Sequence, residues 1–287
     1  MKLELKCLEC FINQAVRAAK LATCDFDKQI TAVKKAAAEI AVLNPDSPPP
    51  AIATGVFKAV IYATGNPDAF SELKKQSNRT VKKLLGRVTG IISSSKDPFS
   101  SSVKAALCGN IIDYGILDNF NVAEVIRREI SADFEQNKIK KIKRIISKSK
   151  EIVFFADNAG EIGLDGRMLN EFRKINPGIR INIFVIDKPI INDATIEDLK
   201  FFRMDKSFKI YRRPNTVGVD IGKLPEKLKK VVVRSDYIIS KGQANYEMLT
   251  DSGLKNIVYL LRAKCDVVAR HAGVREGSPV IIVKSEG

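Results

Sequence analysis

The sequence predicts an α/β protein: an N-terminal helical domain followed by a C-terminal three-layer αβα domain with a mostly parallel, doubly wound sheet. Residues 1–150 carry apolar side chains at spacings of three and four, the period of an amphipathic helix, and contain no β-rich run. From residue 151 onward, short apolar runs alternate with helix-like stretches. The 287 residues amount to about two average domains, and the 45% hydrophobic content is ordinary for a globular protein.

Prolines and turn residues divide the first 150 residues into successive helices. The prolines between 45 and 50 end one helix and start the next, because proline is tolerated only in the first turn. The Gly-Asn-Pro-Asp sequence at 65–68 predicts a turn and a helix cap. We place the domain boundary at residue 150 and expect helices over 8–22, 26–43, 75–85, 103–108 and 122–130 as well as the one that starts at the prolines.

Residues 138–150 form a basic segment, KIKKIKRIISKSK, with seven Lys or Arg residues and no acid. One interpretation is a patch that binds nucleic acid or a membrane surface. The other is the solvated face of a helix, because the isoleucines at 139, 142, 145 and 146 recur at helical spacing. We favour the solvated helix face.

Strand and helix signals alternate through the second domain, 151–287. We expect strands over 152–155, 179–186, 208–211, 237–239, 257–261 and 280–283. Between them we expect helices over 162–175, 196–202, 224–233, 246–251 and 265–271. Near-continuous apolar strands separated by helices are typical of a parallel sheet covered on both faces.

The chain is basic, with 48 Lys and Arg against 33 Asp and Glu and a formal net charge of +15. This excess attracts polyanions or phosphorylated substrates, although high content of both signs is also typical of ion-pair-rich proteins from heat-loving organisms. Tryptophan is absent and no aromatic residues interleave the basic segment, which argues against a nucleic-acid partner. No apolar run could span a bilayer and the N-terminus lacks a signal-peptide pattern, so we expect a cytoplasmic protein without membrane contacts.

Cysteine and histidine usage restricts the chemistry. The five cysteines are too few and too scattered for a disulfide framework, and their odd number fits a reducing cytosol. The single histidine, His271, excludes multi-histidine metal sites and argues against a Ser-His-Asp triad. Carboxylates, amides and lysines must therefore carry any chemistry.

Three polar clusters follow predicted strands: DNAGE at 157–161, NDAT at 192–195 and SKGQAN at 240–245. In a doubly wound sheet, ligands bind beyond the carboxyl ends of the strands, so the fold would bring these clusters to one edge. Taken singly, each cluster could be an N-cap or an ordinary turn. Capping explains neither the paired polar residues nor the shared edge, so we interpret the clusters as one site.

The first two clusters offer oxygen atoms that suit a hard divalent cation. The carboxylates of Asp157 and Asp193 and the amide oxygen of Asn158 supply two or three ligands. Mg²⁺ or Mn²⁺ keeps water in its remaining positions and recruits substrate phosphate. We therefore predict that these three residues bind a divalent metal and carry the catalysis.

The remaining cluster residues are expected to contact phosphate. The helix that begins near Gly160 and Glu161 would direct N–H groups at an anion. Lys241 would supply a mobile positive charge, with Gly242 allowing close approach of the backbone and Asn245 nearby. A metal, a lysine and a helix terminus together form a phosphate-handling arrangement.

The same motifs carry a family resemblance. FADNAGEI, PIINDATIED and SKGQANYE resemble the metal-dependent damage-control phosphatase family. KCLEC, PPP, GNPD and CGNIIDYG are similar to its CxxC-containing subfamily, and RAKCDVVARHAGV extends the match over nearly the whole chain.

This resemblance implies a helical domain packed on an αβα sandwich and a phosphoric monoester hydrolase that acts on small phosphorylated metabolites such as sugar phosphates. It implies that the three residues named above hold a divalent metal, Mn, Mg, Ni or Co, and that Lys241 contacts the phosphate. Asn110 and Asp113, from the helical domain, would close over the same site.

Cys7 and Cys10 form a single CxxC motif whose role stays open. A redox motif would follow a strand, whereas here a helix begins, and one CxxC is only half of a zinc site. A structural role is the third alternative. Cys108 and Cys265 lie in apolar helix patterns, so we expect them in the core.

Two rival enzyme classes lack their sequence signals. A methyltransferase would have a G-x-G-x-G loop after the first strand, and none is present. A haloacid-dehalogenase-type phosphatase would have a second acid two residues after Asp157, where Ala159 stands. We therefore favour an activated water over Asp157 as the nucleophile.

Overall fold

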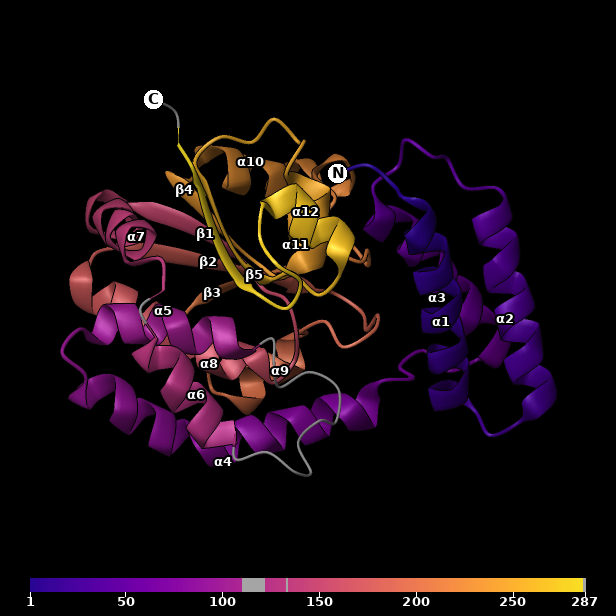
Figure 1. Cartoon of the computed structure of the whole chain (residues 1–287), viewed down its shortest axis with the longest axis horizontal. Helices are drawn as coiled ribbons and strands as arrows, with labels where there is room; N and C mark the ends of the chain where they lie inside the picture. Colours follow the sequence, from indigo (N-terminus) through magenta and orange to yellow (C-terminus); the bar gives the residue numbers. More distant parts are fainter. Residues whose placement is uncertain (110–121, 133, 286–287) are drawn as a thin grey trace.

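A six-stranded sheet forms the centre of the computed structural model, which describes residues 1–109, 122–132 and 134–285 (Figure 1). Its strand order is β3-β2-β1-β4-β5-β6, with β1 to β5 parallel and β6 antiparallel to β5. The strands are β1 (Glu151–Phe155), β2 (Arg180–Ile186), β3 (Lys209–Arg213), β4 (Tyr237–Lys241), β5 (Ile257–Arg262) and β6 (Pro279–Lys284). The predicted mostly parallel, doubly wound sheet is confirmed, and its order reverses between β1 and β4.

Helices cover both faces of this sheet. One layer contains α5 (Pro98–Cys108), α7 (Gln136–Lys148), α8 (Glu161–Ile175) and α9 (Ile196–Phe201), with α4 (Ser71–Ser94) and α6 (Val122–Ser131) packed against it. The other layer contains α10 (Glu226–Arg234), α11 (Gln243–Leu249) and α12 (Asp266–Ala272). Successive strand residues point to opposite faces, so Phe154 joins the first core and Phe155 joins the second.

Three further helices, α1 (Leu5–Ala22), α2 (Phe26–Ala41) and α3 (Pro49–Thr64), form a bundle at one end of the molecule, drawn in indigo in Figure 1. Phe11, Ala36 and Phe57 belong to the core of this bundle. Ile190 and Val217, from the loops after β2 and β3, join the same core. The bundle therefore packs against the carboxyl edge of the sheet.

The predicted domain boundary at residue 150 coincides with the start of the sheet and not with a break in the packing. Val103 of α5 and Ile142 of α7 share a core with Phe154 of β1 and Phe172 of α8. Helices that precede residue 150 thus complete one layer of the αβα unit. Among the N-terminal helices, α1–α3 have a core of their own.

Local sequence accounts for several helix boundaries. The side chains of Asp25 and Asp97 accept a hydrogen bond from the backbone N–H three residues later, at the starts of α2 and α5. Pro49 stands in the first turn of α3, and Gly65 ends that helix with φ +70°. Pro49 thus starts a helix as predicted, but α2 already ends at Ala41, before Pro45. The helix cap predicted at 65–68 for the next helix is wrong, because the N-cap of α4 is Phe70 and it makes no side-chain capping hydrogen bond.

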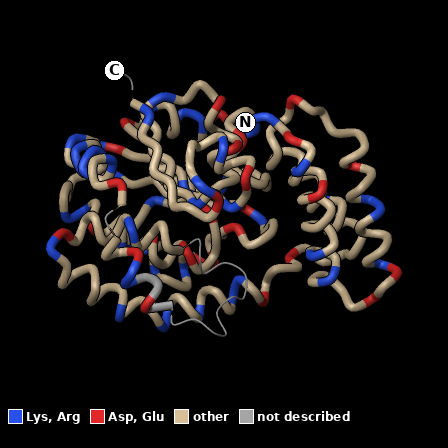
Figure 2. The backbone as a smooth tube through the Cα atoms, viewed as in Figure 1, with Lys and Arg blue, Asp and Glu red and all other residues tan. Residues whose placement is uncertain are grey.

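The basic segment 138–150 lies mainly in α7, whose Lys and Arg residues gather on its outer side (Figure 2). The isoleucines at 139, 142, 145 and 146 are all buried, as expected for one face of a helix. Among the described residues, no helix combines the length and the apolar character needed to cross a membrane.

Candidate metal and phosphate site

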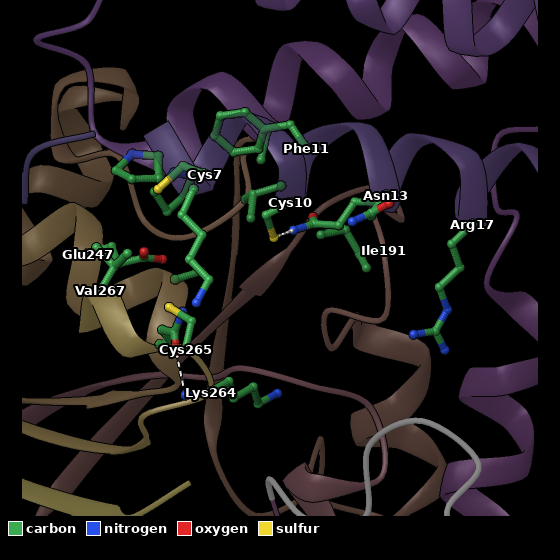
Figure 3. A pocket seen from close by; sticks show the side chains of 18 of the residues that line it. Cys7, Cys10, Phe11, Asn13, Arg17, Ile191, Glu247, Lys264, Cys265 and Val267 are labelled. Atoms are coloured by element: carbon green, nitrogen blue, oxygen red, sulfur yellow. Dashed lines mark hydrogen bonds between the residues drawn. The ribbon is translucent and has the colours of Figure 1, made fainter. Parts of the chain in front are cut away.

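A pocket of about 560 Å³ opens where the strand order reverses, beyond the carboxyl ends of β1 and β4. This switch point is the usual position of a ligand crevice in an open α/β sheet. One wall comes from α1 and the start of α3, and the opposite wall comes from loops at the carboxyl edge of the sheet (Figure 3). The α1–α3 bundle therefore encloses the place where the sequence predicts a site.

All three polar clusters contribute to this pocket: Asp157 and Asn158 from the first, Asn192 and Asp193 from the second, and Gln243 and Ala244 from the third. Asn158 and Asp193 form an isolated antiparallel β-bridge. Beside it, the backbone N–H of Ala194 donates to the carbonyl oxygen of Asp157 at 2.8 Å. These contacts join the loop after β2 to the loop after β1, so that Asp157, Asn158 and Asp193 line the same wall.

Two carboxylates orient the amide group of Asn158. Its Nδ2 atom donates to Oδ2 of Asp157 at 2.8 Å and to Oε2 of Glu161 at 3.3 Å. This network assigns the nitrogen to the side of the carboxylates, because a carboxylate only accepts. Since both N–H groups are used, the amide oxygen is the atom available as a ligand.

Arg213 holds Asp193, and sequence reasoning missed it. Its guanidinium is 2% exposed and donates to Oδ2 of Asp193 at 3.0 Å and to the carbonyl oxygens of Thr216 and Gly218 at 2.8 and 3.1 Å. Burial lowers the pKa of Arg213, and the nearby carboxylate of Asp193 opposes that shift. The available signal was an arginine at the carboxyl end of β3, the strand next to β2.

The donor set fits a hard divalent cation. Two carboxylates and one amide oxygen on a pocket wall suit Mg²⁺ or Mn²⁺, which take few protein ligands and keep several waters. Nowhere in the described part of the chain do three His, Cys, Asp or Glu side chains gather as a metal-binding group. Cation binding here therefore depends on the two carboxylates and the amide, completed by oxygen atoms of substrate or water.

Gly242 leaves the space that the carboxyl group of Asp157 occupies. Its φ of +84° is in the left-handed region. A Cβ atom at this position would lie 2.1 Å from Cγ of Asp157. The close approach expected at Gly242 is therefore made by the carboxylate of Asp157, and only glycine leaves room for it.

Lys241 ends β4, as expected, but its side chain is 0% exposed and not mobile. Its ammonium donates to Oε1 of Glu161 at 2.5 Å, to Oδ1 of Asp165 at 2.6 Å and to the carbonyl oxygen of Ala106 at 2.8 Å. Burial lowers the pKa of Lys241, but the two carboxylates raise it further, so the net pKa is above the ordinary value. All three N–H groups are used within the protein, so the predicted phosphate contact is not available in this arrangement.

Asp165 is a buried acid that sequence reasoning also missed. Burial raises its pKa to about 7; Lys241 opposes this shift and Glu161 adds to it. One ammonium cannot neutralise two carboxylates away from water, so a proton on Asp165 balances the cluster near neutral pH. The available signal was the spacing of Glu161 and Asp165, which places both acids on one face of a helix.

The other residues predicted to contact phosphate are engaged in the fold. The N–H of Gly160 donates to Oδ1 of Asn78, from α4, at 2.7 Å, so this N–H at the start of α8 is occupied. Asn245 is 1% exposed, and its amide donates to two backbone carbonyl groups at 2.6 and 3.2 Å. Asn110 and Asp113 lie outside the residues that the structure describes.

Three cysteines line the pocket (Figure 3). Cys7 and Cys10 belong to α1, and Cys265 precedes α12. Burial raises the pKa of the Cys7 and Cys265 thiols, which disfavours their reactive thiolate forms. The core position expected for Cys265 is wrong, because it is partly exposed on the pocket wall, whereas Cys108 is buried as predicted. The role of the CxxC motif and the subfamily assignment stay predictions.

Cationic side chains also line this pocket. Figure 3 shows Arg17 extending from α1 and Lys264 extending from the loop after β5. Lys6 lines it as well, with its ammonium 2.9 Å from Oδ1 of Asp266. The positive charge near the predicted metal ligands therefore comes from residues that the sequence clusters do not contain.

The chain matches the family model of the damage-control phosphatase ARMT1-like domain over residues 4–280. It is 32% identical over 287 residues to a damage-control phosphatase of Archaeoglobus fulgidus, with 98% of each chain covered. It is 31% identical to a damage-control phosphatase of Pyrococcus horikoshii, with 98% of this chain and 97% of that one covered. The crystal structure of a DUF89 family protein from Pyrococcus horikoshii matches the fold with a TM-score of 0.90 at 29% identity, over 99% of this chain and 100% of that chain.

Proposed function

The chain belongs to the ARMT1-like damage-control phosphatase family, and we propose that it is a divalent-metal-dependent phosphatase that hydrolyses small phosphate monoesters such as sugar phosphates. Family membership supports a phosphatase of metabolite damage control. The observation that carries the proposed metal dependence is the meeting of Asp157, Asn158 and Asp193 on one wall of the switch-point pocket. A volume of about 560 Å³ is in the range of pockets that enclose small metabolites.

In this proposal the protein presents a fixed set of oxygen atoms. Gly242 leaves room for Asp157, Arg213 donates a hydrogen bond to Asp193, and the carboxylate of Glu161 helps to orient Asn158. A bound divalent cation would polarise a phosphoryl oxygen and favour ionisation of a water molecule. The bundle of α1–α3 forms one wall of the same space.

Positive charge for the substrate phosphate is assigned to Lys264 and Arg17. Both line the pocket that contains the proposed metal ligands, and they come from opposite walls. Lys241, to which the sequence assigned this role, is enclosed in a separate ion cluster. Neutralisation of the transferred phosphoryl group is the main electrostatic task of a phosphatase, and the compact charge of a lysine ammonium suits it.

A substrate screen tests this function. The purified protein is assayed for phosphate release from a panel of phosphorylated metabolites with Mg²⁺, Mn²⁺, Co²⁺ or Ni²⁺ added singly. We expect turnover that disappears after exhaustive chelation and returns with added cation. Undiminished turnover after chelation would contradict the metal dependence, and the absence of phosphate release from any small ester would contradict the substrate class.

A further inference from the structure

We propose that Glu161 is a positioning residue: fixed by the buried Lys241, it sets the orientation of the Asn158 amide and so decides which atom Asn158 offers to the metal. This inference rests on the proposed function, because it requires Asn158 to be a metal ligand. In this inference Lys241, from the cluster at 240–245, fixes Glu161, whereas its sequence suggested a contact with phosphate.

The carboxylate of Glu161 joins the lysine to the asparagine. Its Oε1 accepts from Lys241 at 2.5 Å, and its Oε2 accepts from Nδ2 of Asn158 at 3.3 Å. The same Nδ2 donates to Asp157. A flipped amide would place its oxygen against two carboxylates, which cannot donate while ionised. The pair of acids therefore keeps the nitrogen of Asn158 on their side and leaves its oxygen for a cation.

Packing leaves Glu161 little freedom to move. Its side chain is 1% exposed. A Cβ atom at Gly109, which follows α5, would lie 2.5 Å from Cγ of Glu161, so the backbone there closes on the stem of the side chain. Lys241 also donates to the carbonyl oxygen of Ala106, so the ammonium that holds Glu161 is itself tied to α5.

Asp165 provides a matched control within the same cluster. It follows Glu161 by one turn of α8 and accepts from the same ammonium at 2.6 Å. In the described part of the structure, no hydrogen bond joins Asp165 to Asn158. Replacing either acid by its amide changes a hydrogen-bond partner of Lys241, but only Glu161 contacts the amide of Asn158.

The test compares Glu161→Gln with Asp165→Asn, using Mn²⁺ alone in titration calorimetry and thermal unfolding of the metal-free proteins. Lys241 and Asn158 donate to different oxygens of Glu161, and glutamine replaces one of these oxygens by an NH₂ donor, so one of the two contacts is lost. We expect Mn²⁺ affinity to fall about 10- to 100-fold in Glu161→Gln, the loss typical of residues that orient a ligand. Asp165→Asn should retain wild-type affinity. Wild-type affinity in Glu161→Gln, or equal losses in both variants, would overturn the inference.

A second substitution separates orientation from a general structural effect. Asn158→Asp added to Glu161→Gln replaces the amide by a carboxylate, which offers oxygen in either orientation and accepts from the glutamine amide. We expect this double variant to recover Mn²⁺ affinity, and a failure to recover it would also overturn the inference. If Glu161→Gln fails to fold, Glu161→Asp, which keeps the charge but shortens the reach, should show the same loss. Absence of Mn²⁺ binding in the wild-type protein would contradict the proposed function itself, and this inference with it.

Discussion

Two pairs of acidic residues lie near the carboxyl end of β1, and the two pairs differ in their exposure to solvent. Asp157 and Asp193 line a pocket of about 560 Å³. Glu161 and Asp165 are 1% and 0% exposed, and both bind the ammonium of Lys241. The first pair lines a pocket that a cation can enter, although Arg213 already binds Asp193. The second pair is buried around the ammonium of Lys241. Acidic residues are therefore proposed metal ligands in the pocket, whereas in the buried cluster they bind a lysine of the protein itself.

Two lysines repeat this contrast. Lys241 belongs to a conspicuous motif but is enclosed between β4, α5 and α8. Lys264 belongs to no predicted cluster, yet it extends into the pocket (Figure 3). A charged residue near a strand end can thus serve the fold or the ligand, and the elements packed against it decide which.

The largest expected effect comes from removing a pocket acid. Asp157→Ala should lower Mn²⁺ affinity and kcat by at least about 100-fold, because loss of a direct ligand should exceed the effect of losing a residue that only orients one. The metal-free fold should persist, since Asp157 lies on the pocket wall and its loss opens no cavity in the core. Titration calorimetry and thermal unfolding measure the two effects.

A companion variant, Asp193→Asn, keeps an acceptor for Arg213 and should show a similar loss of metal affinity. Asp193→Ala is a poorer choice, because an unpaired buried arginine costs about 3–5 kcal/mol of stability. Unchanged Mn²⁺ affinity in both Asp157→Ala and Asp193→Asn would remove the assigned metal site.

The second prediction tests whether Lys264, and not the buried Lys241, contacts the substrate phosphate. Lys264→Ala should lower kcat/KM about 10- to 150-fold, because a charged hydrogen bond to phosphate contributes about 1.5–3 kcal/mol. Metal affinity should not change, since an ammonium is not a ligand. Lys6→Ala is the comparison variant: Lys6 lines the same pocket from α1 and carries the same charge, and a smaller loss is expected because the phosphate contact is assigned to Lys264. Steady-state kinetics that show equal losses in both variants would reduce the role of Lys264 to general pocket charge.

The third prediction concerns Gly242, which leaves space for the carboxyl group of Asp157. Gly242→Ala and Gly253→Ala both place a side chain at a positive φ, +84° and +74°, which strains the backbone in both variants. Only at Gly242 would the new Cβ meet Asp157, while nothing lies within 4 Å of a Cβ at Gly253. We therefore expect kcat to fall about tenfold in Gly242→Ala alone. Similar kinetics in the two variants would show that the position of Asp157 is not critical.

The smallest expected effect is a pH dependence of stability at the other end of the pocket. Burial raises the pKa of Glu247 to about 8 from an ordinary 4.5, and the N-terminal ammonium lowers it only in part. Because the folded protein favours the protonated form, this contribution to stability is full below pH 4.5 and is lost as the pH rises through 8. Asp165, with a pKa of about 7, changes stability in the same direction.

Thermal unfolding between pH 5 and pH 8 measures this effect. The Tm of the wild-type protein should fall over this range through the contributions of Glu247 and Asp165. In Glu247→Gln, which stays uncharged, the fall should be shallower and the remaining slope should come from Asp165. Parallel curves for the two proteins would show that Glu247 is ionised in the folded state throughout.

Local sequence signals predicted the scaffold well. Apolar runs placed the strands to within a few residues, as for the run 208–211 and the observed β3, Lys209–Arg213. The rule that ligands bind beyond strand ends predicts that the loops with Asp157 and Asp193 meet, and the bridge between Asn158 and Asp193 joins these two loops. These successes depend on periodicity and on topology, and both are visible in the order of residues along the chain.

The surroundings of individual charges could not be predicted in the same way. The burial of Lys241 depends on Ala106 of α5 and on two acids of α8, and both helices are distant from Lys241 in sequence. Arg213 reaches Asp193 only because β2 and β3 are adjacent in the sheet. Such contacts are non-local, so a polar residue beside a strand end looks the same in sequence whether it faces a pocket or the core.

Anomalous diffraction from crystals of the wild-type protein grown with Mn²⁺ tests the central claim most directly. The account predicts one strong Mn²⁺ peak in the switch-point pocket, within bonding distance of the carboxylates of Asp157 and Asp193 and of the amide oxygen of Asn158. A peak beside the cysteine side chains of the same pocket, or saturating Mn²⁺ with no peak at the three oxygen ligands, would contradict it.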